Sequence, residues 1–273
     1  MDDITKPDLK HLHLEMGKIV YGPVLSRRFG RSLGVNVLAL GKKTCSLDCV
    51  YCQLGRTDNP VSDPSHLKTY PSCGDVVVAV ERKLNSEELR IDAITFSGNG
   101  EPTLHPELRD VVEEIRKILD WRGLDIPINI FTNSTQLCFS SVRDELKLFD
   151  NVIAKLDTAD QDCFVALNRP IKDTKVREIV KSLKQLRKEI GSKLTLQTMI
   201  VDSKSDQAIV NYDDGKLAKL ADAVQEIAPA LIQIYTLDRP PAKPHVIQVD
   251  RAKLEHAAKT LAPKLGEDRV HVY

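Results

Sequence analysis

The chain alternates short apolar runs with longer segments of helical periodicity, and this alternation limits the folds open to it. Strands are expected at residues 33–38, 91–97, 127–133, 152–157, 194–201 and 231–237. Helices are expected at about 74–85, 106–121, 140–149, 174–190, 213–228 and 250–262, before a terminal apolar run at 269–273. Because each helical crossover returns the chain to the same end of a sheet, the strands should be parallel.

The number of units distinguishes the candidate architectures. Six strands alternating with six helices are too few for a closed barrel of eight units. We therefore expect an α/β fold that forms an open, partial (β/α)6 barrel, with a doubly wound open sheet as the alternative. A chain of 273 residues suits one domain, with a leader at 1–30, a barrel core at 31–240 and a C-terminal helix and strand at 241–273.

Polar residues lie near the carboxyl ends of the expected strands. Strands buried on both faces of a parallel sheet are usually apolar throughout, and these polar residues share one parity within each strand, which puts them on one face. They are Thr95, Ser97, Asn129, Asn133, Lys155, Asp157, Gln197, Gln233 and Tyr235. Since buried polar groups need partners, they predict a polar lumen at the end where α/β barrels hold their active sites.

Lys155 would face this lumen, and two interpretations of it are open. Desolvation would lower the pKa of its amine and permit Schiff-base chemistry with a carbonyl substrate. Alternatively, Lys155 forms an ion pair with Asp157 or another carboxylate.

Residues 44–52 read T-C-S-L-D-C-V-Y-C and place Cys45, Cys49 and Cys52 in one short loop. Three thiolates this close indicate a metal–sulfur site. A cubane iron–sulfur cluster normally takes four thiolates, whereas the next cysteine is Cys73, so one iron should be open to a ligand from outside the protein. A structural zinc site is the alternative of a different class, but it needs four ligands and no histidine follows within ten residues.

Charge and composition exclude some partners. The chain carries 39 basic and 39 acidic residues, so no overall field favours nucleic acid or an acidic membrane. A local basic excess between residues 23 and 56 indicates either a solvated surface or an anionic ligand near the cysteine loop. No apolar run reaches the ~18 residues that a membrane-spanning helix needs, and no secretion signal is visible at the start. We expect a cytoplasmic protein whose remaining cysteines (Cys73, Cys138, Cys163) are free thiols, ligands of a second cluster or a hydrogen-atom donor.

The cysteine loop resembles the C-x3-C-x2-C signature of radical S-adenosylmethionine (SAM) enzymes, with Tyr51 as the usual aromatic residue before the last cysteine. A second segment, F-S-G-N-G-E-P at residues 96–102, resembles the G-G-E-P segment of that family, with Asn99 at the second glycine position. The resemblance implies a partial (β/α)6 barrel and a 4Fe-4S cluster on Cys45, Cys49 and Cys52. It also implies that the amino and carboxylate groups of SAM bind the open iron.

The resemblance further implies which residues hold SAM. The methionine amino group would lie against the segment formed by Gly98, Asn99, Gly100, Glu101 and Pro102, because glycines allow a ligand to approach the backbone closely. The adenine would lie between Tyr51, Tyr235 and Leu237. Candidates for the ribose and the methionine carboxylate are Asn133, Asp157, Gln197 and Thr198.

The reaction and partners also follow from the resemblance. An external reductant, flavodoxin or ferredoxin, would supply an electron for the cleavage of SAM to methionine and a 5'-deoxyadenosyl radical, which removes hydrogen from a substrate. Further segments at residues 22–36, 49–57, 155–157, 167–170 and 235–242 resemble archaeal 4-demethylwyosine synthases, which modify a guanosine of tRNA. Unlike members with a second cluster, this chain has no cysteine before Cys45. The substrate is therefore expected to be a nucleoside or tRNA, or alternatively a small metabolite or peptide.

Overall fold

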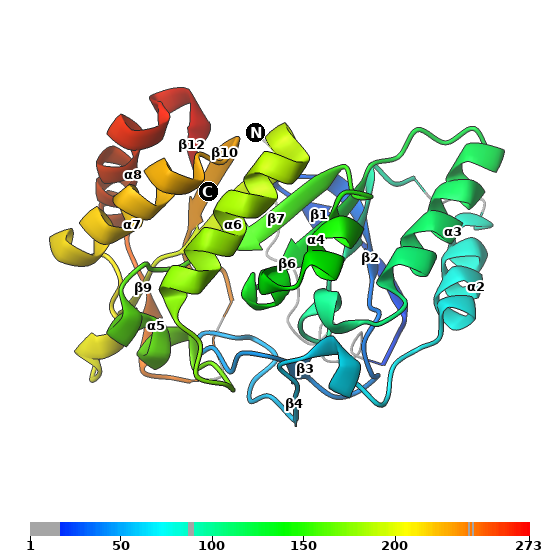
Figure 1. Ribbon diagram of the computed structural model, residues 1–273, viewed down its shortest axis with the longest axis horizontal. Helices are drawn as coiled ribbons and strands as arrows, with labels where there is room; N and C mark the ends of the chain where they lie inside the picture. The colour runs from blue at the N-terminus through cyan, green and yellow to red at the C-terminus, as the bar shows by residue number, and fades with distance from the viewer. Residues whose placement is uncertain (1–16, 87–89, 240, 242) are drawn as a thin grey trace.

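The computed structural model describes residues 17–86, 90–239, 241 and 243–273 (Figure 1). An eight-stranded sheet runs in the order β1-β2-β5-β6-β7-β8-β10-β12. Its strands are β1 Val20–Ser26, β2 Gly30–Val35, β5 Ala93–Phe96, β6 Ile128–Thr132, β7 Asn151–Lys155, β8 Leu194–Met199, β10 Leu231–Tyr235 and β12 Val270–Val272. Two small pairs are formed by β3 Thr44–Cys45 with β4 Asn59–Pro60, and by β9 Val201–Ser203 with β11 Val246–Gln248.

Seven α-helices occur in the described residues. They are α2 Cys73–Leu84, α3 Leu108–Trp121, α4 Ser140–Leu146, α5 Gln161–Asn168, α6 Val176–Ile190, α7 Asp214–Ile227 and α8 Arg251–Leu265. Short 3-10 turns complete the connections at η1 Pro64–His66, η2 Pro102–Leu104, η3 Thr135–Cys138, η4 Gly191–Lys193, η5 Gln207–Ile209 and η6 Glu267–Arg269.

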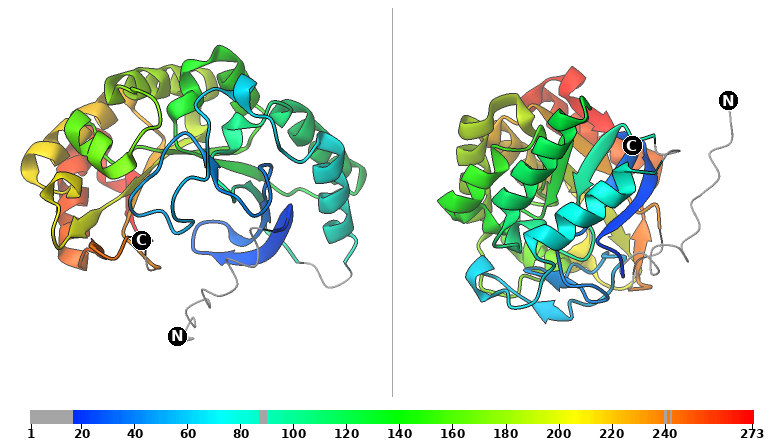
Figure 2. Two further views of the ribbon diagram at one scale, coloured as in Figure 1. Left: turned by 90° about the horizontal axis from the view of Figure 1, so that it is seen from below. Right: turned by 90° about the vertical axis from the view of Figure 1, so that its right-hand side faces the viewer.

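The sheet has the topology of an open partial barrel. From β2 to β12 the strand order follows the chain order, and each neighbouring pair is parallel. The helices line the outer side of the curved sheet, while the loop after β2 lies on its inner side (Figure 2). A doubly wound sheet would reverse its strand order at a switch point, and this sheet does not, so the predicted partial (β/α)6 barrel is confirmed.

Strand β1 and helix α5 were not predicted, and neither were the short strands β3, β4 and β11. Strand β1 lies antiparallel to β2 within residues expected to form a polar leader, whose residues 1–16 lie outside the described part of the chain. Its sequence V-Y-G-P-V-L-S interrupts the alternating pattern with Gly22 and Pro23, and an edge strand tolerates such a proline. Helix α5 is only eight residues long, too short to show clear periodicity, and it begins where the Asp160 side chain accepts from the Cys163 N–H at 2.9 Å.

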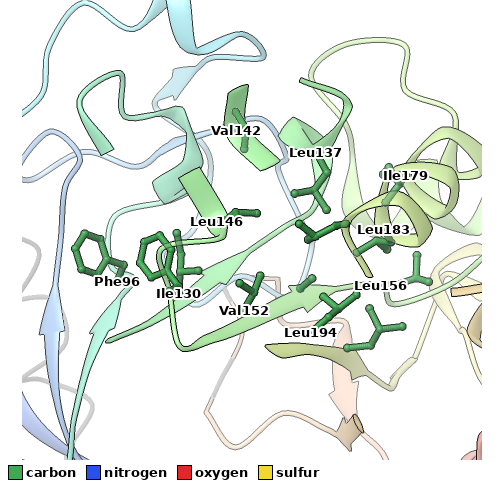
Figure 3. Close-up of a cluster of buried hydrophobic side chains, with 14 of the residues drawn as sticks. Phe96, Ile130, Leu137, Val142, Leu146, Val152, Leu156, Ile179, Leu183 and Leu194 are labelled. Atoms are coloured by element: carbon green, nitrogen blue, oxygen red, sulfur yellow. The ribbon is translucent and has the colours of Figure 1, made fainter. Parts of the chain in front are cut away.

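The main core lies between the sheet and the outer helices. Helix α3 buries one stripe, formed by Leu108, Val111, Val112, Ile115 and Leu119, as helical periodicity requires. Around α4 and α6, apolar side chains pack onto β6, β7 and β8 (Figure 3). Phe96 and Phe149 meet edge to face with ring centroids 5.2 Å apart. This layer gives the polar inner face a rigid support.

The predicted polar face is present on the strands. The parallel register sets Thr95 beside Asn129, and Gln197 between Lys155 and Gln233. Several of these side chains are bonded across strands, as in the contact of Gln197 Nε2 with Gln233 Oε1 at 3.3 Å. The strand parity therefore identified a shared polar surface correctly.

Glu145 of α4 is expected to make stability depend on pH. Burial raises the pKa of its carboxyl from 4.5 to about 7. Between these values the folded state keeps a proton that the unfolded state has lost, so stability falls as pH rises through this range. Because the side chain is partly exposed, the loss is on the order of 1 kcal/mol. Glu145→Gln should raise the melting temperature at pH 8 and leave it unchanged at pH 4, and equal shifts at both would contradict this.

Within the described residues, no helix is both long and apolar enough to cross a membrane.

Candidate functional site

The cysteine loop is joined directly to the glycine-containing segment after β5. Thr44, the residue before Cys45, forms a parallel bridge with Gly100. The Thr44 N–H donates to the Asn99 carbonyl at 2.8 Å, and the Glu101 N–H donates to the Thr44 carbonyl at 3.1 Å. Because β2 and β5 are neighbouring parallel strands, two motifs about fifty residues apart in the chain meet at the carboxyl ends of these strands.

The two glycines of this segment are required by contacts within the protein. A Cβ added to Gly100 would lie 1.7 Å from the Thr44 carbonyl oxygen, and one added to Gly98 would lie 2.8 Å from the Cβ of Asn36. Both glycines also have positive φ, at +142° for Gly100 and +131° for Gly98, which other residues rarely adopt. The backbone of this segment thus approaches Thr44 and Asn36 closely, and its approach to SAM stays a prediction.

Asn99 and Glu101 hold the same junction together. The Asn99 side chain donates to the Ala39 carbonyl at 2.9 Å. Glu101 is buried, and its carboxylate accepts from Thr103 Oγ1 at 2.6 Å and from the Asn133 N–H at 2.5 Å. Burial raises the pKa of Glu101, although these donors oppose the shift. The carboxylate therefore ties the start of η2 to the end of β6.

Two asparagines donate to cysteine sulfurs. Asn133 Nδ2 lies 3.4 Å from Cys45 Sγ, and Asn168 Nδ2 lies 3.5 Å from Cys49 Sγ. Asn133 also donates to Ser46 Oγ at 2.9 Å, so its amide faces the cysteine loop. Asn168 was not among the predicted site residues. Its signal in the sequence was the L-N-R-P segment that follows the strand β7.

The three cysteines suit an iron–sulfur cluster chemically. Burial raises the pKa of Cys45 to about 12 and that of Cys49 to about 11, with added repulsion from Glu101 and Cys52 respectively. The thiols of Cys45 and Cys49 are therefore protonated at neutral pH without metal, and metal binding must displace their protons. Soft thiolates are the ligands that iron–sulfur clusters select.

Among the residues that the structure describes, no three His, Cys, Asp or Glu side chains converge on one metal ion. Outside the loop, Cys73, Cys138 and Cys163 form no disulfide in the described part of the chain.

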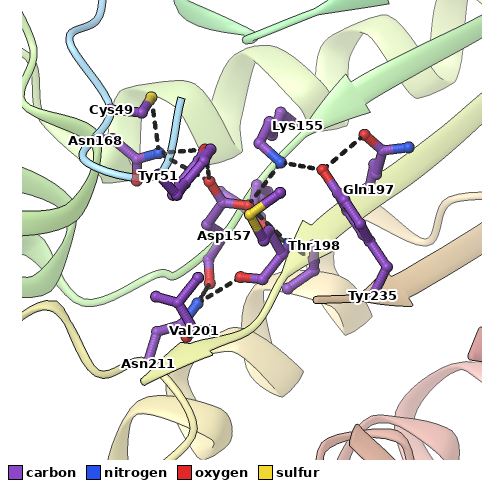
Figure 4. A network of polar contacts seen from close by, with 12 residues as sticks. Cys49, Tyr51, Lys155, Asp157, Asn168, Gln197, Thr198, Val201, Asn211 and Tyr235 are labelled. Carbon is purple, nitrogen blue, oxygen red and sulfur yellow. Dashed lines mark hydrogen bonds and ion pairs between the residues drawn. The ribbon is translucent and has the colours of Figure 1, made fainter. Parts of the chain in front are cut away.

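A polar network extends from the cysteine loop across the strand ends (Figure 4). Tyr51 donates its hydroxyl to Asp157 Oδ2, which also accepts from Asn168 Nδ2 at 2.8 Å. Asp157 Oδ1 lies 3.1 Å from Lys155 Nζ, and Lys155 bonds the Tyr235 hydroxyl at 2.6 Å. A continuous chain of contacts therefore links Cys49 to β10.

Lys155 forms an ion pair with Asp157, which is one of the two alternatives. Burial by itself lowers the pKa of its amine, but the charge of Asp157 and the Tyr235 hydroxyl outweigh burial, so that the pKa is raised. The lowered pKa on which the Schiff-base interpretation depends is therefore not found. Sequence parity placed the two residues on one face but could not weigh desolvation against a carboxylate 3.1 Å away.

Removing this ammonium is expected to destabilise the protein. Lys155→Met would leave the buried Asp157 carboxylate without its counter-ion, at a cost of about 2 kcal/mol, or about 4–8 °C in melting temperature. Adding Asp157→Asn should recover part of the loss, since the two changes share one interaction. Lys117→Met, at an exposed pair with Glu114, is the matched control and should have a small effect. Equal losses in melting temperature from Lys155→Met and Lys117→Met would contradict the prediction.

The remaining residues predicted to bind SAM lie either among buried apolar side chains or on the polar face of the strands. Tyr51 and Leu237 lie in one buried apolar cluster with Val50, Leu167 and Val201, whereas Tyr235 bonds Gln197 Oε1 at 3.1 Å on the polar face. Thr198 is fully buried and donates to the Leu156 carbonyl at 2.7 Å, so its hydroxyl holds β8 to β7. Adjacent residues of a strand point to opposite faces, which explains why Gln197 and Thr198 differ.

A small cavity lies between the cysteine loop and the strand ends. Its lining residues are Leu47, Asn133, Lys155, Leu156, Asp157, Phe164, Asn168 and Ile179. The side-chain oxygen of Asn168 is buried and has no hydrogen-bond partner among the described residues. An N–H donor of a bound molecule would satisfy this acceptor.

The basic excess near the loop is largely engaged in contacts. Arg31 pairs with Asp92 at 2.7 Å, and Arg27 pairs with Asp238. The Arg28 guanidinium lies 5.0 Å from the ring centroid of Tyr235 and 4.6 Å from that of Tyr273. These contacts tie the turn between β1 and β2 to the opposite edge of the sheet.

Residues 42–214 match the protein family described as the radical SAM superfamily, and the match includes both motifs and the strands from β3 to β9. The chain therefore belongs to the radical SAM superfamily, whose members are enzymes that use a 4Fe-4S cluster and SAM and that need an external electron donor. Within the curated proteins it is similar to the UPF0026 protein MJ1312 of Methanocaldococcus jannaschii. The two are 36% identical over 247 residues, which cover 89% of this chain and 70% of the relative.

Solved structures share the fold. A radical SAM methyltransferase from Sphaerobacter thermophilus superposes with a TM-score of 0.63 at 16% identity, covering 89% of this chain and 65% of the methyltransferase. Streptococcus suis SuiB bound to S-adenosylmethionine superposes with a TM-score of 0.59 at 14% identity, covering 88% of this chain and 49% of SuiB. This chain thus spans about two thirds of the methyltransferase and about half of SuiB.

Proposed function

We propose that Cys45, Cys49 and Cys52 hold the 4Fe-4S cluster and that SAM binds between the cysteine loop and the polar strand ends. The bridge between Thr44 and Gly100 carries this proposal, because it joins the two motifs in one site. When bound, the cluster and SAM supply a 5'-deoxyadenosyl radical that removes a hydrogen atom from the substrate. The protein residues position these groups and exclude water.

The surrounding residues take distinct roles in this proposal. The segment Gly98–Pro102 holds the loop at its distance from the strand ends, and Asn133 and Asn168 orient the thiolates. The ammonium of SAM lies against this same segment, near Glu101. Tyr51 and Leu237 pack against the adenine, while Asp157 and Gln197 face the ribose and the methionine carboxylate.

For the substrate we propose a nucleoside or a tRNA, acted on at the polar face beside Lys155 and Tyr235. The resemblance of several segments to tRNA-modifying enzymes supports this choice. The net charge of zero favours a second candidate, a small metabolite or a peptide. A flavodoxin or ferredoxin is proposed as the electron donor.

Anaerobic reconstitution followed by reduction tests the reaction. The protein should bind about four irons and absorb near 400 nm, and dithionite with SAM should yield 5'-deoxyadenosine. If a protein with an intact cluster yields no 5'-deoxyadenosine, the proposal is refuted. Binding of bulk tRNA that weakens steeply with salt would support the first substrate class, and binding that does not depend on salt would favour the second.

A further inference from the structure

Lys43 is a fully buried lysine in the cysteine loop. Its side chain is 2% exposed, although lysine is among the residues least often buried without a partner. Its ammonium donates to the Gly55 carbonyl at 2.9 Å, and the Gly55 N–H in turn donates to the Cys52 carbonyl at 3.1 Å. The side chain thus crosses the loop from the residues before Cys45 to the turn after Cys52.

The protein alone offers this ammonium little negative charge. Asp48 Oδ1 lies 3.8 Å from Lys43 Nζ, beyond ordinary hydrogen-bond distance. The same carboxylate also accepts from the Thr57 N–H at 2.8 Å and lies 3.7 Å from Arg169. A buried cation with so weak a counter-ion would be costly.

The three cysteines provide the missing negative charge once they bind the cluster as thiolates. Lys43 lies two residues before Cys45, and its ammonium bonds the Gly55 carbonyl in the turn that closes on Cys52. Thiolate charges on Cys52, Cys45 and Cys49 raise the pKa of this amine. Three thiolates give the oxidised cluster a net negative charge, and the electron it accepts makes that charge larger. A buried cation at this place would stabilise the reduced state more than the oxidised state, because electrostatic interactions are strong where water is excluded.

We propose that Lys43 is a positioning residue that raises the reduction potential of the cluster by holding a buried positive charge beside its three thiolates. The step affected is the transfer of one electron from the external donor to the oxidised cluster, during which Lys43 neither gains nor loses a proton. The inference rests on the proposed function in one respect, which is that the cluster binds at these cysteines. Burial and hydrogen bonds to the sulfurs are known means by which proteins tune such potentials.

The test is a redox titration of the reconstituted protein without SAM, followed by electron paramagnetic resonance of the reduced cluster. Lys43→Met should lower the ratio of reduced to oxidised cluster at least tenfold at a fixed potential, equivalent to a shift of about 59 mV to more negative potential for one electron. Lys43→Arg keeps the charge and should stay close to the wild type. Lys42→Met is the matched control, because Lys42 is the exposed neighbour and its charge is screened by water and salt.

Iron content distinguishes failure of this inference from failure of the proposed function. A wild-type protein that binds no cluster would refute the proposed function itself. If the wild type is loaded, an unchanged potential in Lys43→Met overturns the inference. If Lys43→Met does not retain iron, Lys43→Gln is measured in its place. Loss of iron from both Lys43→Met and Lys43→Gln, with normal iron loading of Lys43→Arg, supports the inference. An equal loss of iron from Lys43→Arg overturns the inference.

Discussion

Replacing Cys49 with alanine is expected to abolish both iron loading and cleavage of SAM. The loop offers three thiolates, whereas a cubane cluster normally takes four, so the loss of another thiolate should leave too few ligands to hold the cluster. Iron content should fall from about four per chain to near zero, with loss of absorbance near 400 nm and of 5'-deoxyadenosine.

The control for this prediction is the same substitution at a thiol outside the loop. Cys138 is exposed, and Cys138→Ala should retain the full iron content and the full yield of 5'-deoxyadenosine. Circular dichroism of the Cys49→Ala protein should show that the helices remain, since Cys49 is only partly buried. Normal iron loading of Cys49→Ala would show that the cluster is held elsewhere.

Gly100→Ala is expected to separate the two motifs of the site. Its Cβ would lie 1.7 Å from the Thr44 carbonyl oxygen, an overlap that only a movement of the backbone can relieve. We expect a loss of at least about 3 kcal/mol in the free energy of unfolding, which lowers the melting temperature by about 6 °C or more. Iron loading should also fall, because Thr44 precedes Cys45 and would move with the loop.

Gly123 provides the matched control because it separates backbone strain at positive φ from steric overlap of the added Cβ. It also has positive φ, at +64°, but an added Cβ there meets nothing within 4 Å. Gly123→Ala should therefore lower the free energy of unfolding only by the strain of a left-handed conformation in alanine, about 1–2 kcal/mol. It should leave iron loading unchanged. Equal effects of the two substitutions would show that the contact with Thr44 is unimportant.

The regular elements were predictable because each must bury one face. Helix α3 shows its buried stripe directly in the spacing of Leu108, Val111, Val112, Ile115 and Leu119. The polar strand ends were equally visible, since alternation alone puts Lys155 and Asp157 on one face. By contrast, β1 depends on pairing with β2, and its own residues do not alternate.

The roles of single residues were harder to predict because they depend on partners far away in the chain. Contact of Asn133 with SAM stays a prediction, and the contact of its amide with Cys45, 88 residues away, was not visible in the sequence. For Lys155 the sequence left two alternatives open, and only the structure shows it beside both Asp157 and Tyr235, the latter 80 residues away. The L-N-R-P segment and the local basic excess included Asn168 and Lys43, but neither showed that these residues lie near a cysteine.

The sequence by itself determined the class of fold and the chemistry of the cysteine loop. Periodicity reflects local burial, and the spacing of Cys45, Cys49 and Cys52 is a property of nine consecutive residues. Only the tertiary structure decided what the glycines accommodate, which asparagines reach the thiols and why a lysine is buried beside them. These outcomes follow from distances between segments that the fold brings together, and electrostatic and steric energies depend on those distances as well as on residue type.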